Sequence, residues 1–370
     1  MSTEGDNLML SDTIKNILAC NPPDNVRSPR VRKSNSIDLR FNENPYGASP
    51  LAIKAIKDSL SNPYCMSQYP DMSSPLLRQK LSSVLGVESN QIIVGNGSSE
   101  VINFVFSIFG GPGHNAVLER NGFPGHIHAA KATGTDIRFA NNPHFMSSTD
   151  NIISSINEKT ALVVLSNPGN PSGRVFNLEL VRNFISKIPS RVFILLDEAY
   201  FEYANYNNYA GGVELLETFE NIIITRTFSK AYGLAGLRCG YGIAHKNVIF
   251  MLNQVRSRMN VNIIAQMASL AAIDDQDHLN LTLKNNSIEM NKINRRLSLH
   301  GISGVGLDGN FLLFPVNPKN SISFSSFLKE HKFLVKSAFA FGEDDEYIRM
   351  SIGLPEHTEI FCTLLDQYME

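Results

Sequence analysis

The sequence Asn221-Ile-Ile-Ile-Thr-Arg-Thr-Phe-Ser-Lys230 passes directly from an apolar, β-branched run into hydroxyl groups and a lysine. Because the run is continuous rather than alternating, it is typical of a strand that helices cover on both faces. Four similar runs precede it, at residues 91–94, 116–118, 161–165 and 192–196. Helical patterns separate several of them, which predicts an α/β fold with a mostly parallel central sheet flanked by helices.

A change of pattern further along the chain predicts a second, smaller domain of α+β type. Long helices are expected at residues 262–273 and 278–299, then strands at 311–316 and 347–352 and a terminal helix from residue 358. We therefore predict a large ligand-binding domain at residues 41–262 and a small C-terminal domain at residues 263–370. Residues 1–40 are predicted to form an N-terminal arm that contributes to the small domain.

Two helix starts are marked by a serine that precedes a proline, at Ser49-Pro50 and at Ser74-Pro75. Proline is favoured at the first helical position, and a serine before it can cap the helix. Both serines are predicted to be N-caps.

The composition excludes several classes of protein. The 370 residues include 33 Lys and Arg against 35 Asp and Glu, a near balance that argues against a general nucleic-acid binder. No apolar run approaches the roughly 18 residues that a membrane span needs. The cysteines lie far apart and form no CxxC pair, so no disulfide framework or cysteine zinc site is expected. The chain is predicted to be a cytoplasmic enzyme that binds neither nucleic acid nor membrane.

Polar side chains follow four of the predicted strands, at the sheet edge where ligands of open α/β sheets bind. These sequences are Gly95-Asn-Gly-Ser-Ser-Glu100, Ser166-Asn-Pro-Gly-Asn-Pro-Ser-Gly173, Asp197-Glu-Ala-Tyr200 and Thr225-Arg-Thr-Phe-Ser-Lys230. Each is a weak signal alone, but together they predict one site.

The first of these loops is partly similar to a dinucleotide-binding fingerprint. The third glycine of that fingerprint is missing, and Glu100 occupies its place. A helix N-terminus with two serine hydroxyls suits a single phosphate monoester better.

Lys230 alone is consistent with a solvated surface charge, but its surroundings favour a chemical role. Thr227, Ser229 and Arg238 supply donors for a phosphate, and Asp197 ends an apolar strand, where a carboxylate needs a cationic partner. The cationic Arg238 is expected to lower the pKa of Lys230 and so to favour the neutral amine. An imine-forming amine, a carboxylate for a ring nitrogen and phosphate donors are the set that pyridoxal 5'-phosphate requires. The sequence therefore predicts this cofactor.

Further motifs extend the pattern over nearly the whole chain: Asn42-Glu-Asn-Pro-Tyr-Gly47, Tyr69-Pro-Asp71, Gly233-Leu-Ala-Gly-Leu-Arg238 and Arg349-Met-Ser-Ile-Gly353. With these motifs, the chain from about residue 38 to residue 353 resembles the fold-type I (class I/II) pyridoxal-phosphate aminotransferases. Within them it is most similar to the histidinol-phosphate aminotransferase family.

The resemblance implies a role for each matching residue. Lys230 would be the Schiff-base lysine, in an aldimine with the cofactor, and would move the proton at the substrate Cα. Asp197 would pair with the pyridine nitrogen, and Tyr200 and Asn170 would hydrogen-bond the ring oxygen O3'. The phosphate would be held by Ser98, Ser99, Thr227, Ser229 and Arg238.

Four more roles follow from the resemblance. Tyr69 would reach the phosphate of the neighbouring subunit, which implies a homodimer. Phe123 would stack on the ring, although Asn121-Gly122 stands before it where the family usually has Pro-Thr. Arg349 would bind the substrate's carboxylate or phosphate, with Tyr46 near the substrate. His126 and His128 are interpreted as structural or substrate-adjacent, and no metal site is predicted.

One departure from the family bears on the substrate. Lys336 stands thirteen residues before Arg349, where histidinol-phosphate aminotransferases usually have an arginine. Lysine keeps the charge but lacks the bidentate fork of arginine. Histidinol phosphate, an amino acid (aromatic or otherwise) and a specialised biosynthetic intermediate all remain candidate substrates.

The function predicted from the sequence is amino transfer in two half-reactions, from an amino acid or a histidinol-phosphate-like amine to a 2-oxo acid. One alternative is a decarboxylase or an oxidase of an amino acid on the same fold, as in relatives of threonine-phosphate decarboxylase. A non-catalytic cofactor-binding module is a second alternative, against which the complete catalytic set stands.

Overall fold

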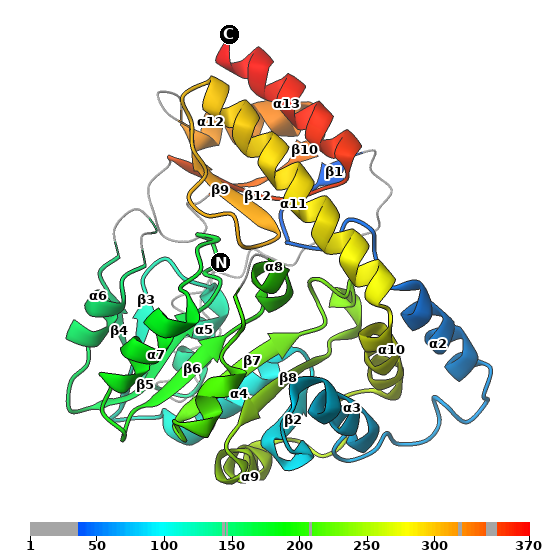
Figure 1. The fold of residues 1–370 in the computed structure, drawn as a ribbon, viewed down its shortest axis with the longest axis vertical. Coiled ribbons are helices and arrows are strands. Elements are labelled where there is room, and N and C mark those ends of the chain that lie inside the picture. The colour runs from blue at the N-terminus through cyan, green and yellow to red at the C-terminus, as the bar shows by residue number, and fades with distance from the viewer. Residues whose placement is uncertain (1–35, 143–144, 146, 207–208, 317–319, 338–345) are drawn as a thin grey trace, which may run out of the picture.

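The computed structural model describes residues 36–142, 145, 147–206, 209–316, 320–337 and 346–370 (Figure 1). Most of the predicted N-terminal arm, residues 1–35, lies outside this part of the chain. The described residues form a large domain around one sheet and a small domain around a second sheet.

The seven-stranded sheet of the large domain has the order β2-β8-β7-β6-β5-β3-β4. Only β8 is antiparallel to its neighbours, so the predicted α/β fold with a mostly parallel sheet is confirmed. The strands are β2 (Ile92–Gly95), β3 (Asn115–Glu119), β4 (Asp136–Ala140), β5 (Thr160–Ser166), β6 (Phe193–Asp197), β7 (Ile222–Thr227) and β8 (Gly240–Ala244).

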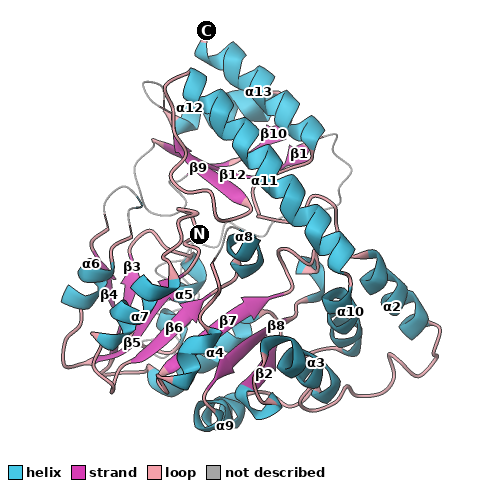
Figure 2. Ribbon diagram, in the orientation of Figure 1, coloured by secondary structure: helices cyan, strands magenta, loops and turns pink. Residues whose placement is uncertain are grey.

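Two hydrophobic layers explain why the central strands are apolar throughout. In β6, Ile194 and Leu196 pack into the layer that contains α7, whereas Leu195 packs into the layer that contains α4. Every side chain of such a strand is therefore buried on one face or the other. Figure 2 shows the strands lying among these helices.

The helices of the large domain divide between the two faces of the sheet. On one face lie α4 (Ser98–Phe109), α5 (Pro124–Ala132) and α9 (Lys246–Val255). The other face is covered by α2 (Pro50–Leu60), α3 (Pro75–Leu85), α6 (Thr149–Ser154), α7 (Leu178–Ser186) and α10 (Ile263–Asp274). The short α8 (Phe201–Tyr206) follows β6. Among the described helices, none combines the length and apolarity needed to span a bilayer.

The small domain is built on α11 (Gln276–Leu299) and a three-stranded antiparallel sheet of order β11-β12-β9. Its strands are β9 (Phe311–Pro315), β11 (Lys336–Ser337) and β12 (Tyr347–Ser351), and α12 (Ser321–Glu330) and α13 (Pro355–Met369) complete it. Near the start of the described chain, β1 (Ile37–Asp38) pairs in parallel with β10 (Phe333–Leu334).

The core contacts bear on the position of the domain boundary. Buried residues of α10, among them Ala265 and Ala268, belong to the hydrophobic layer of the large sheet, together with residues of α2 and α3. We therefore propose that the boundary lies at the start of α11, rather than at residue 262.

The two predicted serine caps differ. The Ser49 side chain accepts a hydrogen bond from the Ala52 N–H and caps α2 as predicted. Ser74 also stands at the N-cap position of α3, as predicted, but its backbone is left-handed, with φ 50°, and its side chain makes no capping bond. In this backbone conformation its hydroxyl is not aimed at the first turn, and Pro75 alone marks the helix start.

The start of α11 is tied to the start of α2 through one carboxylate. Asp275 caps α11 by accepting from the His278 N–H at 3.3 Å. Its other oxygen accepts from the Ser49 hydroxyl at 2.7 Å and from the Leu51 N–H at 3.1 Å. The long helix of the small domain is thus anchored to the large domain at its first residue.

Candidate active site

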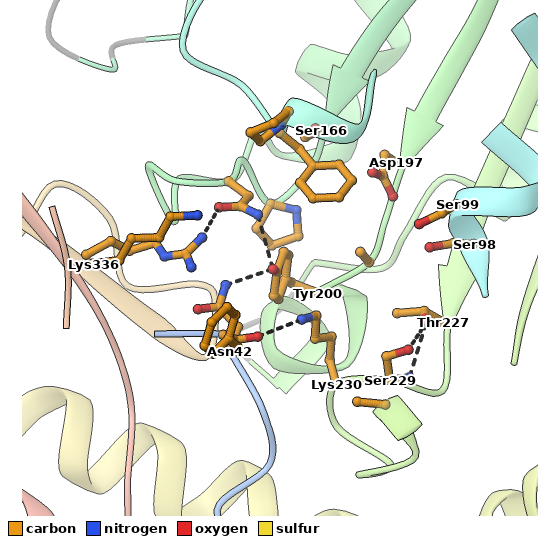
Figure 3. Close-up of a pocket in the computed structure, with 18 of the residues that line it drawn as sticks. Asn42, Ser98, Ser99, Ser166, Asp197, Tyr200, Thr227, Ser229, Lys230 and Lys336 are labelled. Carbon is orange, nitrogen blue, oxygen red and sulfur yellow. Dashed lines mark hydrogen bonds between the residues drawn. The ribbon is translucent and has the colours of Figure 1, made fainter. Parts of the chain in front are cut away.

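A cavity of about 390 Å³ lies at the carboxyl ends of β5, β6 and β7, between the two domains. Its wall includes side chains from the large sheet, from the starts of α4 and α5, from the segment before α2 and from the small domain. In Figure 3 the serine and threonine hydroxyls lie on one side of this pocket and Lys336 on the other. Of the predicted site residues, the following line it: Ser98, Ser99, Phe123, Asn170, Asp197, Tyr200, Thr227, Ser229, Lys230, Arg238, Lys336 and Arg349.

Lys230 lies in the loop after β7 and points into the pocket (Figure 3). Its Nζ donates to the carbonyl oxygen of Phe41 at 3.2 Å. Burial lowers the pKa of Lys230 to about 8, and the nearby cations Arg349 and Arg238 act in the same direction. The neutral amine, which is the nucleophilic form, is therefore accessible near neutral pH. A solvated surface charge does not describe this side chain.

Asp197 ends β6 and is almost fully buried, at 5% exposure. One carboxylate oxygen accepts from the Thr225 hydroxyl at 3.1 Å, and the other lies 3.0 Å from Nε2 of His126. These two contacts fix the plane of the carboxylate at the floor of the pocket. A buried carboxylate held in this way can accept a hydrogen bond from a protonated ring nitrogen.

His126, which was interpreted from the sequence only as structural or substrate-adjacent, contacts the buried carboxylate of the site. It projects from the first turn of α5, and its ring meets that of Phe123 edge to face, with centroids 5.3 Å apart. The spacing of three residues in the sequence could have placed these two rings side by side. The contact with Asp197 spans 71 residues and had no local signal.

Tyr200 lies beside the pocket floor with its hydroxyl among amide groups. The Asn170 Nδ2 donates to this hydroxyl at 3.2 Å, and the Asn42 Nδ2 donates to it at 2.8 Å. Burial raises the pKa of Tyr200 above its ordinary value, so the hydroxyl keeps its proton. A neutral phenol here can donate to an oxygen of a bound ligand.

Arg349 comes from the small domain and is buried, at 4% exposure. Its Nη1 donates to Asn170 Oδ1 at 2.7 Å and its Nη2 to the Arg40 carbonyl oxygen at 2.7 Å. Burial lowers the pKa of Arg349 to about 10, which leaves it cationic at neutral pH. Lys336 is paired directly with Arg349 across β11 and β12, so both cations lie on one face of the small sheet.

The hydroxyl side of the pocket has the features of a phosphate site. Ser98 and Ser99 begin α4, where backbone N–H groups have no carbonyl partner within the helix. Ser229 accepts from the Thr227 hydroxyl at 3.0 Å and from Arg238 Nη1 at 3.4 Å. A side chain at Gly97, whose φ is +83°, would collide with the Arg238 guanidinium. Glycine at this position allows the guanidinium to reach the start of the helix.

Tyr46 and Tyr69 are placed away from this cluster. Tyr46 packs toward α11, where its hydroxyl donates to Asn285 Oδ1 at 3.2 Å. Tyr69 is 86% exposed and lines a separate hollow between α2, the segment after it and α10. The structure of this single chain therefore brings neither tyrosine into the pocket.

The residues present fit pyridoxal 5'-phosphate. The pocket contains an amine that can be neutral near neutral pH, a buried carboxylate with two hydrogen-bond contacts, and a neutral phenol. Hydroxyl groups, the N-terminus of α4 and a guanidinium can bind one phosphate. Among the described residues, no cluster of three or more His, Cys, Asp or Glu side chains could hold a metal ion.

Comparisons with known proteins agree with this site. Residues 34–365 match the family model of the class I and II aminotransferases. The chain is 36% identical to histidinol-phosphate aminotransferase 2 of Hydrogenovibrio crunogenus over 334 residues, which cover 90% of this chain and 88% of that protein.

Two solved structures share the fold. The histidinol-phosphate aminotransferase of Sinorhizobium meliloti in complex with pyridoxal-5'-phosphate superposes with a TM-score of 0.82, at 23% identity over 90% of each chain. The L-threonine-O-3-phosphate decarboxylase of Porphyromonas gingivalis superposes with a TM-score of 0.76, at 20% identity over 90% of this chain and 99% of that one. The family match confirms the resemblance drawn from the sequence motifs.

Proposed function

The chain belongs to the class I and II aminotransferase family, and from this membership we propose that it transfers the amino group of histidinol phosphate to a 2-oxo acid. It is a pyridoxal-phosphate-dependent aminotransferase, and the family match and the identity to aminotransferases favour amino transfer over decarboxylation. The observation that carries the choice of substrate is the pair of cations Lys336 and Arg349 on one wall of the pocket.

The cofactor supplies an electron-withdrawing ring that stabilises negative charge at the substrate Cα. The protein residues would hold and orient it: the hydroxyls at the start of α4 and after β7, with Arg238, would take the phosphate. Asp197, held by Thr225 and His126, would keep the ring nitrogen protonated, and Phe123 would cover one face of the ring. Tyr200 and Asn170 would hydrogen-bond the ring oxygen.

Lys230 is the residue that holds and moves the proton at the substrate Cα. Its lowered pKa allows the Nζ atom to be neutral when it accepts this proton and cationic when it returns it. The Phe41 carbonyl oxygen, 3.2 Å from Nζ, restrains the side chain within the pocket.

The small domain selects the substrate. A phosphate monoester carries close to two negative charges at neutral pH, and Lys336 with Arg349 offers two positive charges. An amino acid with an apolar side chain would place only one carboxylate against these two cations. The pair therefore favours a phosphorylated amine.

The substrate proposal is tested by half-reactions of the purified holoenzyme with histidinol phosphate, histidinol, phenylalanine and aspartate, followed by cofactor absorbance. We expect histidinol phosphate to react with a kcat/KM at least about 100-fold above that of histidinol. Lys336→Ala should reduce this ratio, whereas Lys329→Ala, on the exposed end of α12, should not. Equal rates with histidinol or phenylalanine would exclude the substrate while leaving the cofactor assignment intact.

We also propose a homodimer in which Tyr69 reaches the phosphate site of the partner. Large apolar side chains are exposed along one segment: Leu60, Tyr64, Met66, Tyr69 and Met72. Such a patch is typical of a surface that another chain covers.

Hybrid dimers test this arrangement. Mixed and reassociated Lys230→Ala and Tyr69→Ala chains should regain activity, because one of the two sites then has both residues intact. Absence of any recovery in a hybrid shown to form would exclude a shared site.

We propose a cytoplasmic location as well. Cys65, Cys239 and Cys362 are free thiols in the structure, as expected for a protein in a reducing compartment.

A further inference from the structure

Asn42 has an unusual backbone for a buried residue. It lies between β1 and α2 with φ 54° and only 1% exposure. Residues other than glycine are uncommon in this left-handed region, although asparagine tolerates it better than most. Such conformations persist where the surroundings determine them, and they are frequent at functional sites.

The small domain holds this backbone in place. The Asn42 N–H donates to the Ser351 hydroxyl at 2.8 Å, and the Asn42 carbonyl oxygen accepts from Asn310 Nδ2 at 3.0 Å. The Ser351 hydroxyl hydrogen has two acceptors within reach, the Leu39 carbonyl oxygen at 2.8 Å and Asn42 Oδ1 at 3.1 Å. In the structure the Oδ1 of Asn42 is on the Ser351 side, and its Nδ2 faces the Tyr200 hydroxyl at 2.8 Å.

A second amide approaches the same phenol from another direction. Arg349 Nη1 donates to Asn170 Oδ1, and because a guanidinium can only donate, this contact fixes which end of the Asn170 amide faces Tyr200. Asn170 Nδ2 then donates to the Tyr200 hydroxyl at 3.2 Å. A hydroxyl has two acceptor lone pairs and one hydrogen. With both lone pairs occupied by amide donors, the hydrogen of Tyr200 is left to point elsewhere.

We propose that Asn42 is a positioning residue that turns the Tyr200 hydroxyl hydrogen toward the ring oxygen of the bound cofactor. The proposal rests on the proposed placement of pyridoxal phosphate in this pocket. Tyr200 lines the pocket and its ring packs against Phe311 at 5.0 Å, so the ring itself is fixed and only the hydroxyl hydrogen can turn. Asn42 thus acts through Tyr200 without contacting the reacting atoms.

The chemical consequence concerns the charge on the ring oxygen. A donor fixed against this oxygen stabilises its anionic form, and so lowers the pH at which the bound cofactor loses its proton. The charged and titratable groups that face Tyr200 are Arg349 from β12, Asp197 from β6, Lys230 from the loop after β7 and Tyr203 from α8. All four are unchanged in the variants below. Asn42→Asp adds a carboxylate of its own, and a Tyr200→Phe background measures the direct effect of that charge.

The deciding variant is Asn42→Asp. Aspartate has nearly the same shape and also tolerates the left-handed backbone, but it presents an acceptor to Tyr200 where asparagine presents a donor. The hydroxyl hydrogen would then turn to residue 42 and away from the cofactor. Asn42→Gly suits the backbone and removes the side chain, which covers the case in which the aspartate variant does not fold. Asn183→Asp, on the exposed face of α7, is the matched control.

The measurement is the pH titration of the visible absorption of the purified holoenzyme, with the dissociation constant of pyridoxal phosphate as a second readout. Asn42→Asp should raise the titration midpoint by about one pH unit, and Asn42→Gly by less. In a Tyr200→Phe background, Asn42→Asp should cause a clearly smaller shift, which is the direct effect of the added carboxylate charge. A merely structural role would lower stability in urea without moving the midpoint.

Three outcomes overturn the proposal. These are an unchanged midpoint in Asn42→Asp, an unchanged midpoint in Asn42→Gly where only that variant folds, and a shift of full size in the Tyr200→Phe background. Failure of the wild-type chain to bind pyridoxal phosphate would instead overturn the placement of the cofactor on which the proposal rests.

Discussion

The floor of the pocket, formed by Asp197 and Lys230, and its wall from the small domain, formed by Arg349 and Lys336, are built in different ways. On the floor, Asp197 and Lys230 stand at the ends of adjacent strands, and their orientation is set by side chains of the large domain and by Phe41. On the wall, Arg349 and Lys336 come from a small antiparallel sheet. Arg349 reaches the floor through Asn170 and is also bonded to the Arg40 carbonyl oxygen. We propose that the floor carries the chemistry common to every substrate and that the wall determines the choice among substrates.

Removal of the floor amine should have the largest effect. Lys230→Ala is expected to reduce kcat by at least about 10⁴-fold for every amino donor, because the other amine in the described pocket lining, Lys336, lies on the wall from the small domain. Stopped-flow half-reactions would measure it, with Lys187→Ala, at an exposed position directly after α7, as the matched control. Residual activity within tenfold of wild type would contradict the assignment of this lysine.

The floor carboxylate should come next. Asp197→Asn keeps the shape and the contact with Thr225 but removes the charge that holds the ring nitrogen protonated. We expect a loss of about 10² to 10⁴-fold in kcat, similar for all donors, with cofactor still bound through its phosphate. A loss confined to one donor would show that Asp197 acts in the choice of substrate and not in the chemistry common to all donors.

A wall substitution should act on substrates selectively. Arg349→Lys removes the fork whose two arms donate to Asn170 and to the Arg40 carbonyl oxygen, which we expect to cost about 2 to 3 kcal/mol, or about 30- to 150-fold in kcat/KM for donors that contact Arg349. The proton-transfer rate at saturating donor should change less. Arg295→Lys, at an exposed position on α11, is the control. An equal fall in kcat/KM for donors with and without an anionic group would contradict the division into floor and wall.

The smallest effect is expected in the pH dependence of cofactor uptake, which tests the floor residue Lys230. Lys230 has a pKa of about 8, lowered from 10.5, so its reactive neutral form increases as the pH rises through 8. The rate at which the apoprotein takes up pyridoxal phosphate should therefore be about tenfold lower at pH 7 than at its plateau above pH 9. Absorbance after rapid mixing measures this rate. A half-maximum near 10.5 would show that burial does not act on this amine.

The floor was predicted from the sequence better than its surroundings were. Apolar runs that end in Asp197 and in the loop before Lys230 mark adjacent parallel strands, and such ends must lie together. The contacts of His126 with Asp197 and of Asn42 with Tyr200 join segments 71 and 158 residues apart, and they depend on packing that no local pattern encodes.

Two strands of the sheet were also missed for physical reasons. β4 lies at the sheet edge, and its mixed exposure leaves no continuous apolar run. β8 contains Gly240 and Gly242, and because glycine is unfavourable inside a strand, this segment was not predicted to be one. In the structure both glycines are needed, because a side chain at either would collide with α4: with the Ser98 N–H at Gly240 and with Val101 at Gly242.

The carboxylate of Asp275 joins the two domains at the start of α11. It holds the first turns of α2 and α11 together (Figure 1), and we expect any rotation of the small domain to have its pivot near this point. The 24 residues of α11 form a lever about 36 Å long. A swing of roughly 5° at the pivot moves its far end by about 3 Å, the length of a hydrogen bond. A small tilt at one buried acid is thus enough to make or break contacts at the opposite end of the small domain.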